Sequence, residues 1–418
     1  MSTPTTSHPT VTNDTNAPTE SNNQYLQAVF AGGLTKNEIF WRDRQEWIEK
    51  HGYMLRPRFR PGWVPSWKDS NKLYMKFEDG SFFWAAGRVL DAKRISDGEI
   101  VLLKKVRVRD PSLGVQPELK MGPLFQTEPY ASDPRNHCVP IYETLTLPDE
   151  DNMVLIVMPF LYKWDEPLFE TVGEALEFCR QMFEGLQFMH AHRIAHKCVL
   201  LVLVNVFKTQ FSTSDIKYDN VMADIRPLFD VPVHPTSLER SYDWKTFPSP
   251  KSRTRRPIKY YLIDFDMCEQ YDSSADPPQK EPPYGGDLSV PEFAHKPSKP
   301  CNPFAVDVYR LGNVVREGIT GGGTSKLHKQ KLDPTFKFLH PLIADMTQDD
   351  PAKRPTMDEV VARFDTIVKG LSGLRLRSRV SDAPENANES PRLPPVHWVR
   401  QLFNFLSRAP AIPTPPKK

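Results

Sequence analysis

The sequence has no long hydrophobic run and no apolar leader. Its most apolar stretch, CVLLVLVNVF at residues 198–207, is shorter than the ~20 apolar residues that a helix needs to span a membrane. Residues 1–24 are polar and lack the apolar core of a secretory signal peptide. We therefore expect an intracellular protein, cytoplasmic or nuclear, with no transmembrane segment.

Cysteine is scarce, and its spacing excludes two kinds of structural site. The five cysteines are odd in number, none stands in a CxxC pair, and no zinc-type spacing occurs. This pattern is typical of reduced thiols and disfavours a disulfide framework. The formal net charge is only +2, so bulk charge points neither to nucleic acid nor to a membrane surface. We expect a monomer that does not bind nucleic acid.

Proline, in contrast, is abundant. The 41 prolines are about twice the ordinary usage of ~5%, which predicts long connections and tails. Residues 1–34 hold too little apolar surface to offset the entropy of ordering, and we expect them to be disordered. The Pro-rich tail, residues 372–418, has one apolar patch, Trp398–Leu406. That patch could fold onto the domain, or bind a partner helix or a membrane surface.

Between the tails the pattern changes from strand-like to helix-like. Aliphatic runs at residues 99–106 and 153–158 predict buried strands. Three Thr-x-x-Glu capping boxes predict helix starts, at Thr35–Glu38, Thr171–Glu174 and Thr356–Glu359. After the second and third boxes, apolar residues recur at helical spacing. The sequence therefore predicts an α+β protein, with a strand-rich part followed by a helix-rich part.

One stretch carries a recognisable set of chemical groups if residues 198–214 are set aside. His196-Lys197 then runs directly into Asp-Ile-Lys-Tyr-Asp-Asn. The joined stretch resembles the catalytic loop of the eukaryotic protein kinases, His-Arg-Asp-x-Lys-x-x-Asn. In that family the loop supplies a base for the attacking hydroxyl, a cation for the phosphoryl group and a magnesium ligand. The resemblance assigns these roles, in order, to Asp215, Lys217 and Asn220.

Further motifs follow in the order that kinases have. Val101-Leu-Leu-Lys104 resembles the strand whose lysine grips the ATP phosphates, although Lys105 would take its place if the register slipped. The helix glutamate that pairs with this lysine would be Glu118, with Glu128 as the alternative. Tyr260-Tyr-Leu-Ile-Asp264 resembles the strand that precedes the second magnesium ligand, here Asp264. The ATP-binding positions implied in addition are Gly87, Met158 and Leu161.

Several structural landmarks of the kinase large lobe also have counterparts. Val290-Pro-Glu292 resembles Ala-Pro-Glu, the end of the kinase activation segment. Asp307-Val-Tyr-Arg-Leu-Gly312 resembles the Asp-x-Trp-x-x-Gly helix start, and Arg354 lies in a stretch similar to Asp-Pro-x-x-Arg-Pro-Thr. The resemblance implies that Glu292 pairs with Arg354 and that His196 packs the catalytic loop. Segments around residues 60–67 and 132–138 resemble the divergent kinase-like proteins of mushroom-forming fungi.

The resemblance covers residues 75–370 and implies a bilobal kinase-like fold. We expect an extension at 35–74, a small β-rich N-lobe at 75–161 and a larger helical C-lobe at 162–371, joined by a hinge at 159–163. The implied activity is ATP- and Mg²⁺-dependent transfer of the γ-phosphate to a protein Ser/Thr hydroxyl. The sequence does not identify the protein substrate or any other partner.

Departures from the family pattern leave an alternative open. Only Gly87 stands where the phosphate lid has three glycines, Asp266 replaces the glycine of the Asp-Phe-Gly motif, and Lys197 replaces an arginine. The alternative is therefore a catalytically impaired pseudokinase that acts as a binding or scaffold module. A small-molecule kinase is disfavoured, because the Val-Pro-Glu and Arg-Pro-Thr motifs belong to the protein-kinase large lobe.

Residues 198–214 separate Lys197 from Asp215 and have three explanations. They could be an excursion that inactivates or regulates the site, or a loop that the core ignores. They could also be a short intron translated in frame, which is our hypothesis because the motif is intact on both sides. An exposed run of this apolar character would be prone to aggregation.

Overall fold

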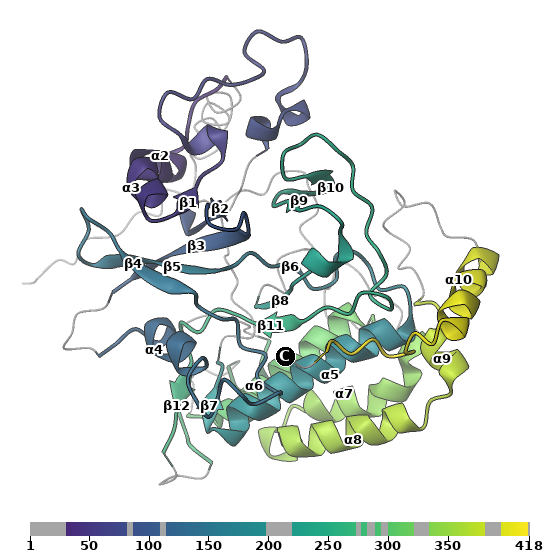
Figure 1. Cartoon of the computed structure of the whole chain (residues 1–418). Helices are drawn as coiled ribbons and strands as arrows, with labels where there is room; N and C mark the ends of the chain where they lie inside the picture. Colours follow the sequence, from purple (N-terminus) through teal and green to yellow (C-terminus); the bar gives the residue numbers. More distant parts are fainter. Residues whose placement is uncertain are drawn as a thin grey trace, which may run out of the picture. The chain divides into compact units, whose positions relative to one another are not determined.

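A computed structural model describes residues 31–81, 87–108, 114–197, 220–272, 277–281, 289–293, 300–321, 334–380 and 394–416. The chain divides into two compact units, Met1–Glu99 and Ile100–Lys418, and each is considered by itself (Figure 1). Asp215, Lys217, the 198–214 stretch and residues 1–30 of the N-terminal tail lie outside the described residues.

The first unit is built from short elements around buried arginines. Its helices are α2 (Lys36–Asp43) and α3 (Gln45–Lys50), its antiparallel strands are β1 (Tyr53–Met54) and β2 (Val89–Arg94), and its 3₁₀ turns are η1 (Pro57–Phe59), η2 (Tyr74–Lys76) and η3 (Glu78–Gly80). The predicted capping box is confirmed, because Thr35 and Glu38 exchange both hydrogen bonds. Arg58 Nε donates to Glu38 Oε1 at 2.6 Å, so the cap residue also fixes a buried guanidinium.

An antiparallel sheet begins the second unit. It contains β3 (Ile100–Arg107), β5 (Met153–Pro159) and β4 (Glu143–Thr146), with β5 paired to both of the others. Every residue of β5 after the first is buried, as an unbroken aliphatic run requires. The two strands predicted from the aliphatic runs are therefore confirmed. The short helix α4 (Pro117–Leu124) follows β3 in sequence.

Short strands form three smaller antiparallel sheets in the same unit. Strand order in the largest is β11 (Tyr260–Leu262), β8 (Val221–Ala223) and β6 (Tyr162–Lys163). The pairs are β7 (Ile194–Ala195) with β12 (Glu269–Gln270), and β9 (Val233–His234) with β10 (Ser237–Ser241). Motif residues lie next to these short strands: His196 follows β7, Asn220 precedes β8, and Asp264 comes shortly after β11.

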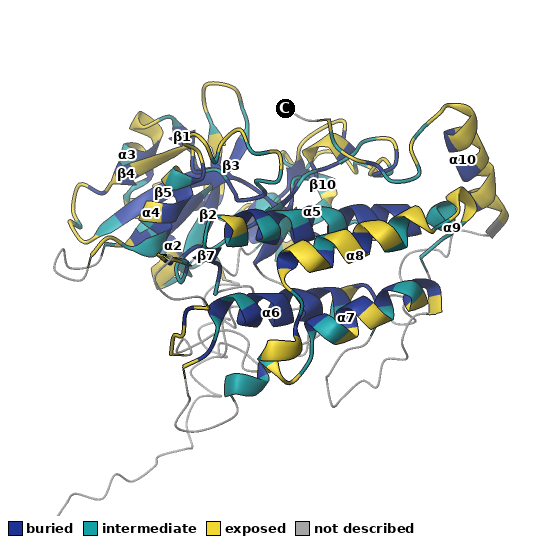
Figure 2. Ribbon diagram, turned by 90° about the horizontal axis from the view of Figure 1, so that it is seen from below, coloured by how far each residue is buried: buried dark blue, intermediate teal, exposed yellow. Residues whose placement is uncertain are grey.

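The second unit also contains several further helices. They are α5 (Val172–Ala191), α6 (Pro303–Gly318), α7 (His340–Met346), α8 (Met357–Lys369), α9 (Gly373–Arg377) and α10 (Pro394–Leu406), with 3₁₀ turns η6 (Arg226–Leu228), η7 (Pro291–Phe293), η8 (Pro334–Leu339) and η9 (Pro351–Lys353). The largely buried helix α5 packs against β11 and α8 (Figure 2). The rings of Phe183 and Phe364 meet edge to face across the α5–α8 contact, with centroids 5.2 Å apart.

The two predicted helix starts of this unit differ in their capping. Thr356 and Glu359 form a complete capping box, as predicted. At α5, Thr171 caps the backbone of Glu174, but the Glu174 carboxylate accepts from Glu170 N, one residue before the cap, at 2.7 Å. Its other oxygen accepts from Thr254 N and Thr254 Oγ1, both at 2.8 Å. These buried donors come from a distant loop, so the local sequence pattern does not predict them.

The architecture confirms the α+β class. Cys138, Cys179, Cys268 and Cys301 are all buried and free, in keeping with reduced thiols. Within the described residues no helix has the length and apolar character required to cross a membrane.

Candidate functional site

Lys104 is the cation at the centre of the candidate site. Strand β3 turns it to the buried side of the sheet, because side chains alternate along a strand, and Lys105 is left partly exposed. Lys104 Nζ donates to Glu118 Oε1 at 2.6 Å and to Asp264 Oδ1 at 2.8 Å. Of the two lysines that the sequence left open, Lys104 is thus the one that contacts the acidic motif residues.

Glu118 comes from the first turn of α4. Pro117 begins this helix, where its missing N–H costs no hydrogen bond, and Glu118 follows it as a buried residue. A carboxylate in the first turn also interacts favourably with the helix dipole. The alternative partner, Glu128, is exposed and accepts from Ser132 Oγ, so the geometry places Glu118 beside Lys104.

Asp264 follows the end of β11 in an unusual backbone conformation. Its φ is +66°, a region that few residues other than glycine adopt, although aspartate tolerates it better than most. Such strain is concentrated at functional sites. Asp266, which stands where kinases have glycine, is not among the described residues with positive φ. The backbone freedom of glycine is therefore not required at position 266 in this conformation.

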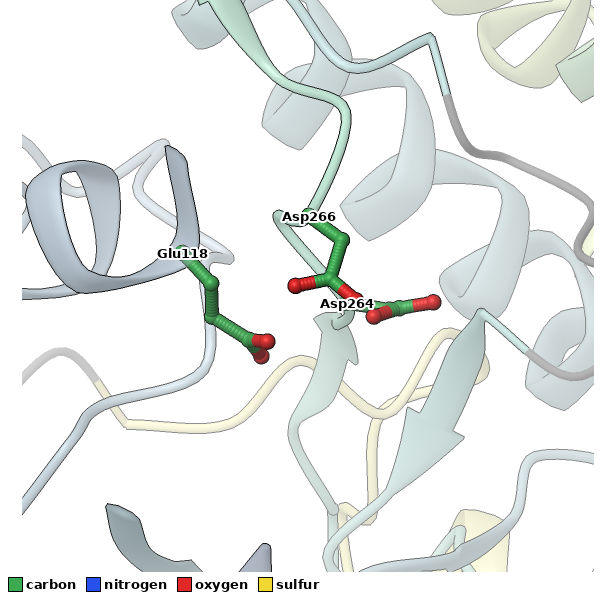
Figure 3. Close-up of side chains that lie close together, drawn as sticks. All are labelled: Glu118, Asp264 and Asp266. Carbon is green, nitrogen blue, oxygen red and sulfur yellow. The ribbon is translucent and has the colours of Figure 1, made fainter. Parts of the chain in front are cut away.

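Three carboxyl groups gather around the single ammonium. Ligand oxygens of Glu118, Asp264 and Asp266 lie within 4.8 Å of one another (Figure 3). Glu118 reaches the group from α4, and the two aspartates come from the loop after β11 (Figure 3). Acidic clusters occur without a bound ion, so the cluster alone does not identify a metal site.

Burial and mutual repulsion control the charges in this cluster. Burial alone would lower the pKa of Lys104, but the Glu118 and Asp264 carboxylates outweigh it and raise that pKa. Burial raises the pKa of Glu118 to about 8 against the opposing effect of Lys104, and Asp266 adds to the rise. Glu118 thus retains its proton more readily than an exposed glutamate does.

Asn220 lies beside the Asp264 segment through the backbone. It immediately precedes β8, is buried, and its carbonyl oxygen accepts from Ile263 N at 3.1 Å. The pairing of β8 with β11 therefore brings the sequence neighbourhoods of two predicted magnesium ligands together.

Asp307 fixes the backbone at the start of the catalytic-loop motif. This fully buried residue accepts from His196 N at 2.7 Å and from Lys197 N at 2.8 Å. Burial alone would raise the pKa of Asp307, but hydrogen bonding and charge from His190, with the His196 ring and N–H, lower it. Arg310 donates to the Lys197 carbonyl, and Lys197 takes a positive φ of 58°. Two side chains of α6, Asp307 and Arg310, thus hold the backbone of residues 196 and 197.

A second ion cluster surrounds Glu269 and was not found by the sequence analysis. Its carboxylate accepts from Lys197 Nζ at 2.6 Å, pairs with Lys280 Nζ at 2.8 Å and accepts from Tyr271 Oη at 3.0 Å. Burial would raise the pKa of Glu269, but these partners lower it to about 2. Only the pairing of β12 with β7 brings Lys197 near Glu269, which explains why no local motif predicts the cluster.

The ion pair implied for the large-lobe landmarks is present. Arg354 donates from NH1 and NH2 to the two Glu292 oxygens, at 2.8 and 2.6 Å. The same guanidinium donates to the carbonyl oxygens of Ala305 and Gln348. Arg354 thereby ties η7 to α6 and to the segment before η9.

The remaining predicted ATP-binding residues are Met158, Leu161 and Gly87. Met158 is opposite Leu102 on the β3–β5 ladder and Leu161 follows β5, and both side chains are buried. Gly87 belongs to the first unit and precedes β2.

Comparison with known proteins adds no relative to this picture. No protein-family model matches the chain, and no curated protein matches it significantly.

Proposed function

We propose that the chain has a bilobal kinase-like fold and transfers the γ-phosphate of ATP, with Mg²⁺, to a protein Ser/Thr hydroxyl. One observation carries this proposal: a strand lysine, a helix glutamate and an aspartate after a third element form one buried ion cluster. These residues lie in the order and on the element types that phosphoryl transfer of the protein-kinase type requires.

The residues present fit both ATP and magnesium. A lysine ammonium is a suitable ligand for phosphate oxygens, and the Asp264 carboxylate and Asn220 amide offer the oxygen atoms that Mg²⁺ prefers. Bound magnesium would neutralise negative charge on the transferred phosphoryl group. Glu118 orients Lys104, whose raised pKa keeps it protonated at neutral pH. Asp215 would accept the proton of the substrate hydroxyl, and Lys217 would stabilise the phosphoryl oxygens.

A pseudokinase is the second candidate, and the acidic crowding favours it. Asp266 adds a carboxyl that the kinase pattern lacks, and Asp264 is engaged with Lys104. In this alternative the cluster is a structural ion network, and the protein binds a partner without turnover.

Thermal shift with ATP and Mg²⁺, followed by transfer of labelled phosphate to a generic protein substrate, tests the proposal. We expect stabilisation and transfer in the native chain, and loss of both in Lys104→Met and Asp264→Asn. Lys105→Met, a neighbouring lysine on the other face of β3, should retain both. Stabilisation without transfer would favour the pseudokinase, and neither response in a chain lacking residues 198–214 would refute the kinase proposal.

Sequencing the messenger RNA across codons 190–220 addresses the insertion directly. Removal of codons 198–214 by splicing would place Asp215 immediately after Lys197, as the catalytic loop requires. Their retention in the mature protein would favour the pseudokinase.

A further inference from the structure

Helix α10 turns a polar stripe toward the protein. Its buried side chains recur at intervals of four and three residues and so lie on one face: His397, Gln401 and Asn404. The His397 ring hydrogen bonds through Nε2 with Arg377 O at 2.9 Å, and Arg255 Nε donates to Asn404 Oδ1 at 2.8 Å. Hydrogen bonds of His397 and Asn404 thus tie the inner face to the rest of the chain.

The segment after α10 fixes this orientation further. Arg377 NH2 donates to Ala409 O at 2.6 Å, and Thr414 Oγ1 donates to Glu177 Oε2 at 3.1 Å. The backbone also approaches α5 so closely that a Cβ at Gly173 would lie 1.9 Å from Ala411 O. The segment after α10 is thus anchored to α5 and to Arg377, and the face of α10 opposite His397, Gln401 and Asn404 points outward.

The outward face of α10 is apolar. Its large apolar side chains are 46% to 67% exposed, namely Val396, Trp398, Val399, Leu402, Phe403, Phe405 and Leu406. Leu374 of the neighbouring helix α9 is 73% exposed. Figure 2 shows the exposed face of α10 beyond α9. Single exposed apolar residues are ordinary, but a helix with its whole apolar side uncovered marks an interaction surface.

Positive charge is in excess in the part of the sequence that contains this face. Residues 366–418 contain nine lysines and arginines against three acids, Asp382, Glu385 and Glu389. Their described cations are Lys369, Arg375, Arg377, Arg379, Arg400 and Arg408. Arg400 pairs with Glu170, and the cations of residues 366–418 outnumber the acids of the same residues. A second copy would bring the same cations to the interface, so charge disfavours self-association.

We propose that α10 and α9 form a docking face for the surface of an anionic lipid bilayer. The apolar side chains would enter the boundary between headgroups and acyl chains, where Trp and Phe are favoured, and the cations would meet the lipid headgroups. With 13 residues, α10 is shorter than the ~20 that span a bilayer, so it would lie in the membrane plane. The near-neutral whole chain conceals this local excess of positive charge.

Co-sedimentation of the full chain with phosphatidylcholine vesicles, with and without phosphatidylserine, tests the proposal. We expect binding to the phosphatidylserine vesicles that weakens with added salt. The Phe403→Asp/Phe405→Asp variant should bind at least about tenfold more weakly, because it places charge in the acyl boundary. Phe247→Asp makes the same change at an exposed phenylalanine outside α9 and α10, and should bind like the native chain.

Phe405→Ser provides a second variant that adds no charge, and circular dichroism of each variant checks that it is folded. Absence of native binding to phosphatidylserine vesicles would overturn the proposal, as would equal binding by native chain and α10 variants. A concentration-dependent dimer that Phe405→Ser abolishes, without vesicle binding, would overturn it in favour of a second copy as the occupant.

Discussion

The Lys104 cluster and helix α10 depart in opposite ways from the usual distribution of polar and apolar side chains. Around Lys104, charged groups are buried, and Lys104 forms ion pairs with Glu118 and Asp264 within the second unit. On α10, the buried side chains are polar and two of them, His397 and Asn404, form hydrogen bonds with the rest of the chain. The large apolar side chains of the helix are exposed. Buried polar groups persist when partners within the chain compensate them. An uncovered apolar face has no such compensation, which is why the first region suggests internal chemistry and the second an external partner.

The largest stability effect is expected where a buried charge loses its partner. Arg354→Ala removes a fully buried guanidinium from Glu292 and from three carbonyl oxygens, and should lower the free energy of unfolding by about 3 kcal/mol or more. Urea denaturation measures this. Arg363→Ala breaks an exposed pair with Asp345, in which Arg363 is 42% exposed, and should cost less than about 1 kcal/mol. Equal losses in the two variants would contradict this prediction.

Removal of Lys104 should cost less than removal of Arg354. Lys104→Met leaves three carboxyl groups without their ammonium, at about 1 to 3 kcal/mol. The loss is limited because Glu118, with a pKa of about 8, can hold a proton. Lys105→Met should be nearly neutral. Urea unfolding of both variants at neutral pH is the measurement, and a larger loss in Lys105→Met would mean that the strand register is wrong.

These two regions also show how far sequence reasoning reached. The aliphatic runs predict β3 and β5, and motif order points to Asp264 and to Lys104, with Lys105 left as the alternative. Glu118 stayed in competition with Glu128 because α4 is short and weakly patterned. The apolar patch in the tail was visible, but its orientation was not. His397 and Asn404 point inward only because Arg377 and Arg255, which lie elsewhere in the chain, supply their partners.

The cluster at Glu269 gives an acid-dependent effect of smaller size. Its pKa falls from 4.5 to about 2 in the folded chain, so it binds fewer protons than the unfolded chain in that range. The stabilisation is therefore fully present above pH 4.5 and is lost as the pH falls toward 2. Because the side chain is 36% exposed, we expect less than about 1 kcal/mol at neutral pH. Glu269→Gln should match the native chain at the acid end and fall below it at neutral pH. A constant difference across the pH range would contradict the assignment.

The smallest effect, expected at Phe405, distinguishes α10 from an ordinary amphipathic helix. In an ordinary amphipathic helix, loss of an aromatic side chain destabilises the helix more than loss of a neighbouring amide side chain. Here Asn404→Ala removes a buried acceptor from Arg255 and should cost about 1 kcal/mol, whereas Phe405→Ala should stay within about 0.5 kcal/mol. Hydrogen exchange of the α10 amides reports on local opening, so it detects this difference even if the rest of the chain stays folded. Faster exchange in Phe405→Ala than in Asn404→Ala would mean that the apolar side is the packed side, and the docking face would have to be abandoned.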